Sequence, residues 1–147
     1  MQVTSMLQLI GPVISSALAI SLASLGLRVF GGVSMANHGY PKLFGKDRSQ
    51  VKEKTVKLGI PSSLFDLISV LEFLGGVFVA VGFLTPLASG LLALQMVGNA
   101  LWHVRTLRKP PFSVKFRGGY EIDILYLAIM LAIFILGPGM FSMDKIL

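Results

Sequence analysis

The sequence predicts an all-α integral membrane protein, a bundle of four helices in which neighbouring helices run antiparallel. Hydrophobic residues make up 54% of the 147 residues and charged residues only 14%, a balance typical of membrane proteins rather than soluble ones. Four apolar stretches each approach the ~20 residues that cross ~30 Å of hydrocarbon. No strand-like alternation is present, so helices rather than barrel strands must satisfy the backbone. The stretches cover residues 9–36, 63–84, 86–103 and 120–137.

The segments between these stretches predict how the helices connect within one domain, residues 1–147. The first stretch lacks the basic leader of a secretory signal, so we expect it to be retained. Residues 46–63 mix charged and apolar side chains and predict a short interfacial helix, after which Ser63 and Asp66 resemble a capping box. Gly76 and Ala80 form a small-xxx-small pair that favours close helix packing. The short joint at 84–86 makes the second and third helices antiparallel neighbours.

The charges predict the orientation of the chain in a cell membrane that it crosses several times. Eleven of the thirteen Lys and Arg residues fall in two loops, 37–61 and 104–119. The positive-inside rule makes both loops cytoplasmic, so the N- and C-termini lie on the extracytoplasmic side. The net charge of +6 is then a topology signal and an attraction to anionic lipid, which argues against nucleic-acid binding.

Arg28 and Glu72 are charged residues in the interior of apolar stretches, away from the stretch starts where Asp66, Glu121 and Asp123 lie. The helical rise places Arg28, nine residues before Asn37, roughly 14 Å below the cytoplasmic surface, and places Glu72, ten residues after Ser62, roughly 15 Å below it. An isolated ion near the bilayer centre costs at least ~3 kcal/mol, so each needs a partner. We therefore predict a buried ion pair between Arg28 and Glu72. Its role, either fixing helix register or acting in binding or proton movement, stays open.

Polar residues gather at the cytoplasmic end of the predicted bundle. Gln95, Asn99 and His103 follow four-residue steps and form a stripe along one helix face. Glu121 and Asp123 stand about 200° apart around a helix, so they do not easily face one pocket. They either stabilise the positive end of the helix dipole, or at least one of them faces inward. We predict a polar pocket whose candidate residues are Arg28, His38, Glu72, Asn99, His103, Glu121 and Asp123.

The sequence favours no independent catalytic activity and identifies no catalytic residue. The chain has no cysteine, which excludes disulfide relays and thiolate metal sites. No His and carboxylate set has close ligand spacing, so no metal site is expected. His38 and His103 could supply axial ligands, but interfacial histidines are common, so haem is not expected and no intrinsic cofactor is predicted. Trp102 and Tyr120 are interpreted as interfacial anchors.

Several separated motifs occur in an order that resembles the DoxX family. They are Arg28 followed by HGYPKLFG (38–45), GIP (59–61), EFLGGVFVAVGFLTPLA (72–88), GGYEIDILYL (118–127) and GPGMFSMD (137–144). The resemblance covers residues 28–144 and implies a four-helix membrane protein. Namesakes of the family are small subunits linked to thiosulfate:quinone oxidoreductase or terminal-oxidase modules of respiratory membranes. The recurring polar positions that it implies here are Arg28, His38, Gly39, Lys42, Glu72, Gly119, Glu121 and Asp144.

Three classes of function are compatible with these observations. The first is an accessory subunit of a membrane electron-transfer complex, with His38, His103 or Glu121 as hydrogen-bond or proton partner of a quinone oxygen. The second is a carrier or channel for a small solute or ion, with Arg28 and Glu72 lining the path. The third is a structural scaffold or assembly factor. The resemblance favours the first, and the expected partners are the lipid bilayer and either other membrane subunits or further copies of this chain.

Overall fold

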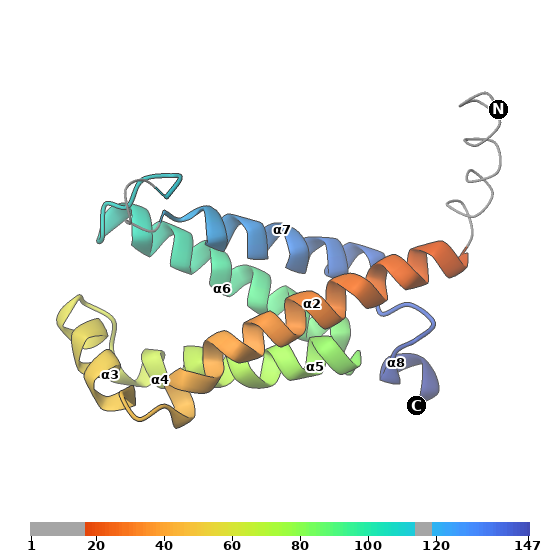
Figure 1. Ribbon diagram of the computed structural model, residues 1–147, viewed down its shortest axis with the longest axis horizontal. Helices are drawn as coiled ribbons and strands as arrows, with labels where there is room; N and C mark the ends of the chain where they lie inside the picture. Colours follow the sequence, from red (N-terminus) through yellow and green to blue (C-terminus); the bar gives the residue numbers. More distant parts are fainter. Residues whose placement is uncertain (1–16, 114–118) are drawn as a thin grey trace.

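The computed structural model describes residues 17–113 and 119–147, and the regular structure in these ranges is entirely helical. The prediction of an all-α protein is therefore confirmed. The elements are α2 (Ala17–Phe44), α3 (Arg48–Lys57), α4 (Ser62–Val70), the π-helical turn η1 (Leu71–Gly75), α5 (Gly76–Val81), α6 (Thr85–Arg105), α7 (Glu121–Leu136) and α8 (Met143–Ile146). In Figure 1, α6 and α7 lie side by side and α2 crosses α5, while α3 and α8 occupy opposite ends.

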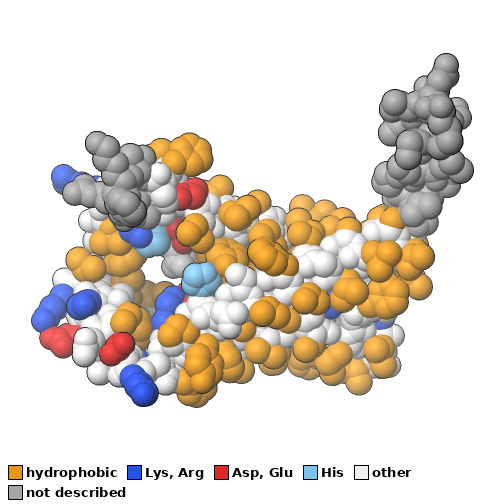
Figure 2. Space-filling model, viewed as in Figure 1, with side chains coloured by type: hydrophobic (Ala, Val, Ile, Leu, Met, Phe, Trp, Pro, Cys, Tyr) orange, Lys and Arg blue, Asp and Glu red, His pale blue; other side chains and the backbone are white. Residues whose placement is uncertain are grey.

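Three segments are long and apolar enough to cross a membrane: Ala17–Phe44, Ser62–Val81 and Thr85–Arg105. The second of these runs unbroken through α4, η1 and α5. The fourth apolar stretch forms α7, whose 16 residues are fewer than the ~20 that usually span hydrocarbon. Hydrophobic side chains cover the visible face of the helices, and most visible charges gather near α3 (Figure 2). This surface suits a lipid environment, so the chain is a membrane protein.

The first helix continues further than the sequence predicted. The apolar stretch was expected to end at residue 36, but α2 runs to Phe44 and includes Pro41. His38 and Lys42 look like loop residues in a hydropathy pattern, yet they lie on a helical face that meets other polar groups. Residues 9–16 of the predicted stretch lie outside the described residues. The other three helical segments match their predicted bounds within two or three residues.

The short helix predicted in the first loop is present as α3, and Asp66 fastens it to α4. The Asp66 carboxylate accepts hydrogen bonds from Arg48 Nη2 at 2.7 Å and from Lys52 Nζ at 2.5 Å. The predicted capping role of Asp66 is wrong, since this carboxylate bonds across to α3 and no side chain caps the N-terminus of α4. These ion pairs hold α3 against the end of the helices.

Glycines bring the backbones of α2 and the η1–α5 segment into direct contact. A Cβ on Gly32 would lie 2.5 Å from Gly76 O and from Ala80 N, and a Cβ on Gly39 would collide with Phe73 N. Since no larger residue fits, two helices approach here as closely as their backbones allow. The close packing predicted from Gly76 and Ala80 is confirmed. Next to this seam lies a core of buried side chains that includes Met35, Val79, Leu92, Met96, Met130 and Ile133.

The end opposite α3 is closed by the C-terminal segment. Asp144 accepts hydrogen bonds from the backbone N–H groups of Leu84 at 2.7 Å and Thr85 at 2.8 Å, which caps α6. The buried Arg28 donates from Nη2 to Phe141 O at 2.8 Å. Burial alone would raise the pKa of Asp144, but hydrogen bonds from Thr85 and Leu84 and the charge of Arg28 outweigh it and lower that pKa. The segment thus joins α2 to the start of α6.

Gly32→Ala tests the close packing of α2 on α5, with Gly26→Ala as the matched control on the same helix. A Cβ at Gly32 meets fixed backbone atoms, whereas a Cβ at Gly26 meets nothing within 4 Å. We expect Gly32→Ala to destabilise by about 1–3 kcal/mol, and Gly26→Ala to be neutral or stabilising by up to about 1 kcal/mol. Thermal unfolding in detergent, followed by circular dichroism, measures both. Equal unfolding temperatures for the two variants would contradict the packing.

Candidate functional site: a polar cavity beside α3

A cavity of about 360 Å³ opens at the α3 end of the protein, between α2, the α4–η1 segment, α6 and α7. The space-filling view shows it as a hollow between the part of the molecule that holds α3 and the part that holds the α6–α7 connection (Figure 2). Most of its polar wall consists of His38, Lys42, Glu72, Asn99, His103 and Asp123. Its apolar and aromatic wall includes Met35, Phe65, Ile68, Met96, Trp102 and Tyr126. We call this space the polar cavity.

Glu72 reaches the polar cavity from the π-helical turn η1 and is only 2% exposed. Its carboxylate accepts a hydrogen bond from Lys42 Nζ at 2.5 Å and another from Gln95 Nε2 at 2.7 Å. A carboxylate buried among membrane helices needs such partners, because desolvation of an unpaired charge is costly. π-helical turns are frequent at functional sites, and here the turn carries a charged residue that lines the cavity.

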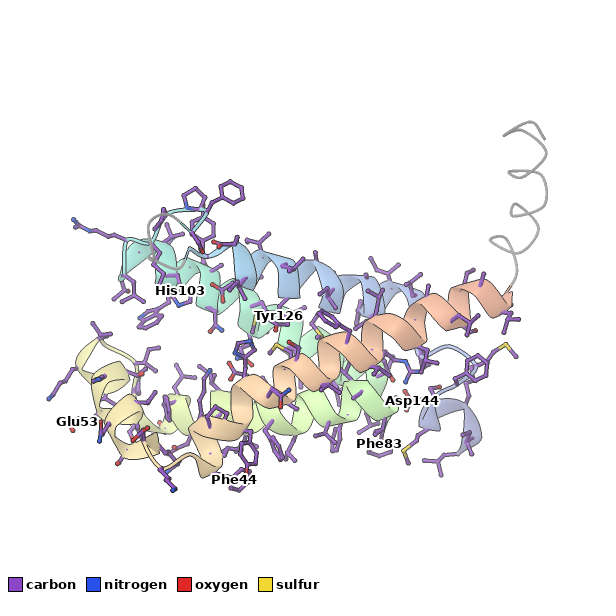
Figure 3. All side chains as sticks on the ribbon, in the orientation of Figure 1. Phe44, Glu53, Phe83, His103, Tyr126 and Asp144 are labelled. Carbon is purple, nitrogen blue, oxygen red and sulfur yellow. The ribbon has the colours of Figure 1, made fainter. Side chains whose placement is uncertain are left out.

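His103 and Asp123 form a second pair on the opposite wall. Nδ1 of His103, in the last turn of α6, lies 2.5 Å from Oδ2 of Asp123 in the first turn of α7. Asp123 is buried, and about a fifth of the His103 side chain is exposed. Figure 3 shows His103 and Tyr126 in the space between the α6–α7 pair and α2. With Nδ1 engaged by a carboxylate, Nε2 of His103 is left to interact with whatever enters the cavity.

His38 of α2 contacts α7 at Tyr126, one turn after Asp123. Its Nε2 lies 3.1 Å from the hydroxyl oxygen of Tyr126, and this hydroxyl also hydrogen-bonds the hydroxyl of Ser34. The two rings stand nearly perpendicular, at 87°. Helix α7 therefore supplies a partner for a histidine from α6 and, three residues later, a partner for a histidine from α2.

The structure brings five of the seven predicted pocket residues together and separates two. His38, Glu72, Asn99, His103 and Asp123 line the polar cavity. Glu121 instead bonds the backbone N–H and the hydroxyl of Ser113, so it fastens the connection before α7. Of the two acidic residues at this helix start, only Asp123 faces inward.

Arg28 lies near α8, at the opposite end from the cavity, and the predicted ion pair with Glu72 is wrong. Arg28 bonds Phe141 O, whereas Glu72 bonds Lys42 and Gln95. The depth estimate failed because it took the helix to end near Asn37. The seven further residues from Asn37 to Phe44 put Arg28 about 10 Å farther from that end than assumed.

Lys42 and Tyr126 were absent from the predicted pocket. A signal for the first was available, since Ser34, His38 and Lys42 follow four-residue steps and so share one face of α2. Tyr126, three residues after Asp123, likewise shares its face of α7. Tyrosine is as common in membrane cores as in sites, so that spacing alone did not single it out.

Among the residues that the structure describes, some buried polar atoms have no hydrogen-bond partner, and two of them belong to this region. They are Nε1 of Trp102, a residue of the cavity wall, and Oε1 of Gln95, whose amide nitrogen bonds Glu72. Within residues 17–113 and 119–147, no group of three or more His, Asp or Glu side chains is arranged to hold a metal ion.

The sequence matches one family model and is similar to a bacterial protein. The family model described as DoxX matches residues 23–105, more than half of the chain. A protein of Bacillus subtilis (strain 168) named "Putative oxidoreductase CatD" is 29% identical over 130 residues, which cover 86% of this chain and 87% of that protein. No solved structure matches the chain.

A double-mutant cycle on Lys42 and Glu72 tests their pairing. Lys42→Met leaves a carboxylate that is 3% exposed without its cation, so we expect a loss of about 3 kcal/mol in the free energy of unfolding. Glu72→Gln should cost less, because the Lys42 side chain is 31% exposed and can turn toward water. The double variant should therefore be more stable than Lys42→Met alone. Thermal unfolding in detergent measures all three, and additive losses would exclude the pairing.

Proposed function

This chain belongs to the DoxX family, and from that membership we propose that it is an accessory subunit of a quinone-linked oxidoreductase or terminal-oxidase complex. Its polar cavity would hold the head group of a quinone. The name of the Bacillus subtilis relative, an oxidoreductase, supports a redox setting. The proposal assigns the redox centre to a partner subunit and the holding of the quinone head group to this chain.

The observation that carries the proposal is the composition of the cavity wall. A quinone head group is a flat apolar ring with two oxygens that accept hydrogen bonds, so it needs apolar walls and a few placed donors. Met35, Phe65 and Met96 supply apolar surface. His38, Asn99 and His103 are polar side chains of the same wall. The residues present therefore fit such a ligand. When bound, a quinone supplies two-electron, two-proton redox chemistry, while the chain binds and orients it and exchanges protons with it.

The structure weakens the carrier hypothesis in one respect. That hypothesis used Arg28 and Glu72 as charges along one path, but they bond to different partners near different ends of the protein. Arg28 is fully buried and tied to the C-terminal segment. A binding site confined to the α3 end suits a subunit that presents a ligand to a neighbouring subunit. It suits a path through the membrane less well.

The proposal includes four membrane crossings with the two basic loops in the cytoplasm, which a cysteine scan can test. The chain has no native cysteine, so Lys54→Cys on α3 and Met140→Cys after α7 each introduce a unique, exposed thiol. We expect a membrane-impermeant maleimide to label the first only in inside-out vesicles and the second only in right-side-out vesicles. Labelling of both from the same side would refute this topology.

Native mass spectrometry of the tagged chain, released gently from its own membrane, tests the accessory role and the ligand together. We expect it to appear with oxidoreductase or oxidase subunits and with the added mass of a quinone. Asn99→Phe fills the cavity and should abolish the quinone mass while the partner subunits remain. A chain that appears alone, or only as a homo-oligomer, and without quinone would refute the proposal and make solute flux the next assay.

A further inference from the structure

The two histidines of the polar cavity are held in different ways by one helix. Asp123 and Tyr126 lie three residues apart on α7, which puts their Cβ atoms about 5–6 Å apart. Asp123 bonds His103 of α6, and Tyr126 bonds His38 of α2. The two imidazoles thus line the cavity from two different helices, α6 and α2.

The charge state of His103 decides what it offers to a ligand. With Nδ1–H donated to the Asp123 carboxylate, a neutral ring leaves Nε2 as an acceptor, and only the protonated ring has an Nε2–H donor. A carbonyl oxygen, which only accepts, can therefore bond His103 only when the imidazole is protonated. A hydroxyl, which donates, can bond the neutral ring.

His38 does not share this restriction. The hydroxyl chain from Ser34 through Tyr126 can donate to His38 Nε2, which leaves Nδ1 as the protonated nitrogen of a neutral ring. His38 can then donate to a carbonyl oxygen without taking up a proton. The difference between the histidines comes from their partners: a carboxylate requires a donor from the ring, whereas a phenol can itself donate.

From this asymmetry we propose that the cavity binds the oxidised form of a 1,4-quinone only together with one proton, held on His103, and binds the reduced quinol without it. His38 supplies a donor that does not depend on pH. This inference rests on the proposed function, since it takes a quinone as the ligand. Histidine is the side chain whose ordinary pKa lies between pH 5 and 8. The other titratable or charged groups that face the cavity are His38, Lys42, Glu72, Lys109, Asp123 and Tyr126.

Trp102 gives a direct reading of this binding, because it is the only tryptophan of the chain and lies on the cavity wall. Quinones quench indole fluorescence on contact. The probe is 2,3-dimethoxy-5-methyl-1,4-benzoquinone, titrated into purified protein in detergent between pH 5.5 and pH 8.5, with its quinol titrated under argon. Asn99→Phe, which fills the cavity, measures the non-saturating collisional quenching to be subtracted.

For wild-type protein we expect saturable quenching by the quinone, with a Kd that rises with pH by at most about tenfold per pH unit, as linkage to one proton requires. The Kd of the quinol should stay constant or fall over the same range. His103→Gln keeps a neutral donor, so its quinone Kd should be about tenfold weaker at pH 5.5 and independent of pH. His38→Gln should weaken binding but retain the dependence.

The outcomes separate this inference from the function on which it rests. If neither redox form gives saturable quenching, the quinone pocket itself is refuted. If quenching saturates but the Kd of wild-type protein is independent of pH, or if the dependence survives in His103→Gln, proton linkage at His103 is refuted and the pocket stands. Should His103→Gln fail to fold, Asp123→Asn replaces it: an amide, unlike a carboxylate, can donate to Nδ1 and leave Nε2–H as a donor of the neutral ring, so the pH dependence of the quinone Kd should weaken, and an unaltered dependence overturns the proposal.

Discussion

The contact between the backbones of α2 and the η1–α5 segment is the constraint on which the polar cavity depends. Gly32 and Gly76 let the two helices touch. Gly39 continues this contact to the backbone nitrogen of Phe73, the residue after Glu72. At that point the chain forms the π-helical turn η1. The glycine seam thus fixes α2 against the residue that carries the buried carboxylate, and Lys42, one turn beyond Gly39, is within reach of it.

The protein has buried charges near both ends, and their partners differ. Near α8, Arg28 bonds a backbone carbonyl of the C-terminal segment, and Asp144 of the same segment caps α6 and lies close enough to interact with the Arg28 charge. Near α3, Glu72 is paired with a lysine. Arg28 does not line the polar cavity. Glu72 and Lys42 do, so polar groups at the α3 end face an open space. Of these two arrangements in the described residues, the one at the α3 end presents polar groups to a cavity that can hold a ligand.

Much of the fold could be predicted from the sequence because hydropathy and loop chemistry act locally. The helical segments, the interfacial helix α3 and most of the pocket residues follow from apolar length and four-residue spacing. The Arg28 to Glu72 pairing could not be predicted, because depth depends on where α2 ends, and its last two turns are polar on the face that meets the cavity. The partner of Arg28 comes from residue 141, 113 positions away, and local pattern carries no information about such a contact.

The charges in the cavity argue for a neutral ligand. Glu72 is matched by Lys42, and Asp123 lies within hydrogen-bond distance of the His103 imidazole, so each of these carboxylates has a partner in the cavity wall. Lys109, at the end of the wall nearest the loop, interacts with the charge of Glu121. An ion entering among such pairs would have to displace one partner and leave another charge unpaired, at a cost of several kcal/mol. A neutral ring avoids this cost and gains from contact with the apolar wall. The oxygens of a quinone only accept hydrogen bonds, and those of a quinol also donate them. Such a molecule would use two histidines that differ in whether a neutral ring can donate.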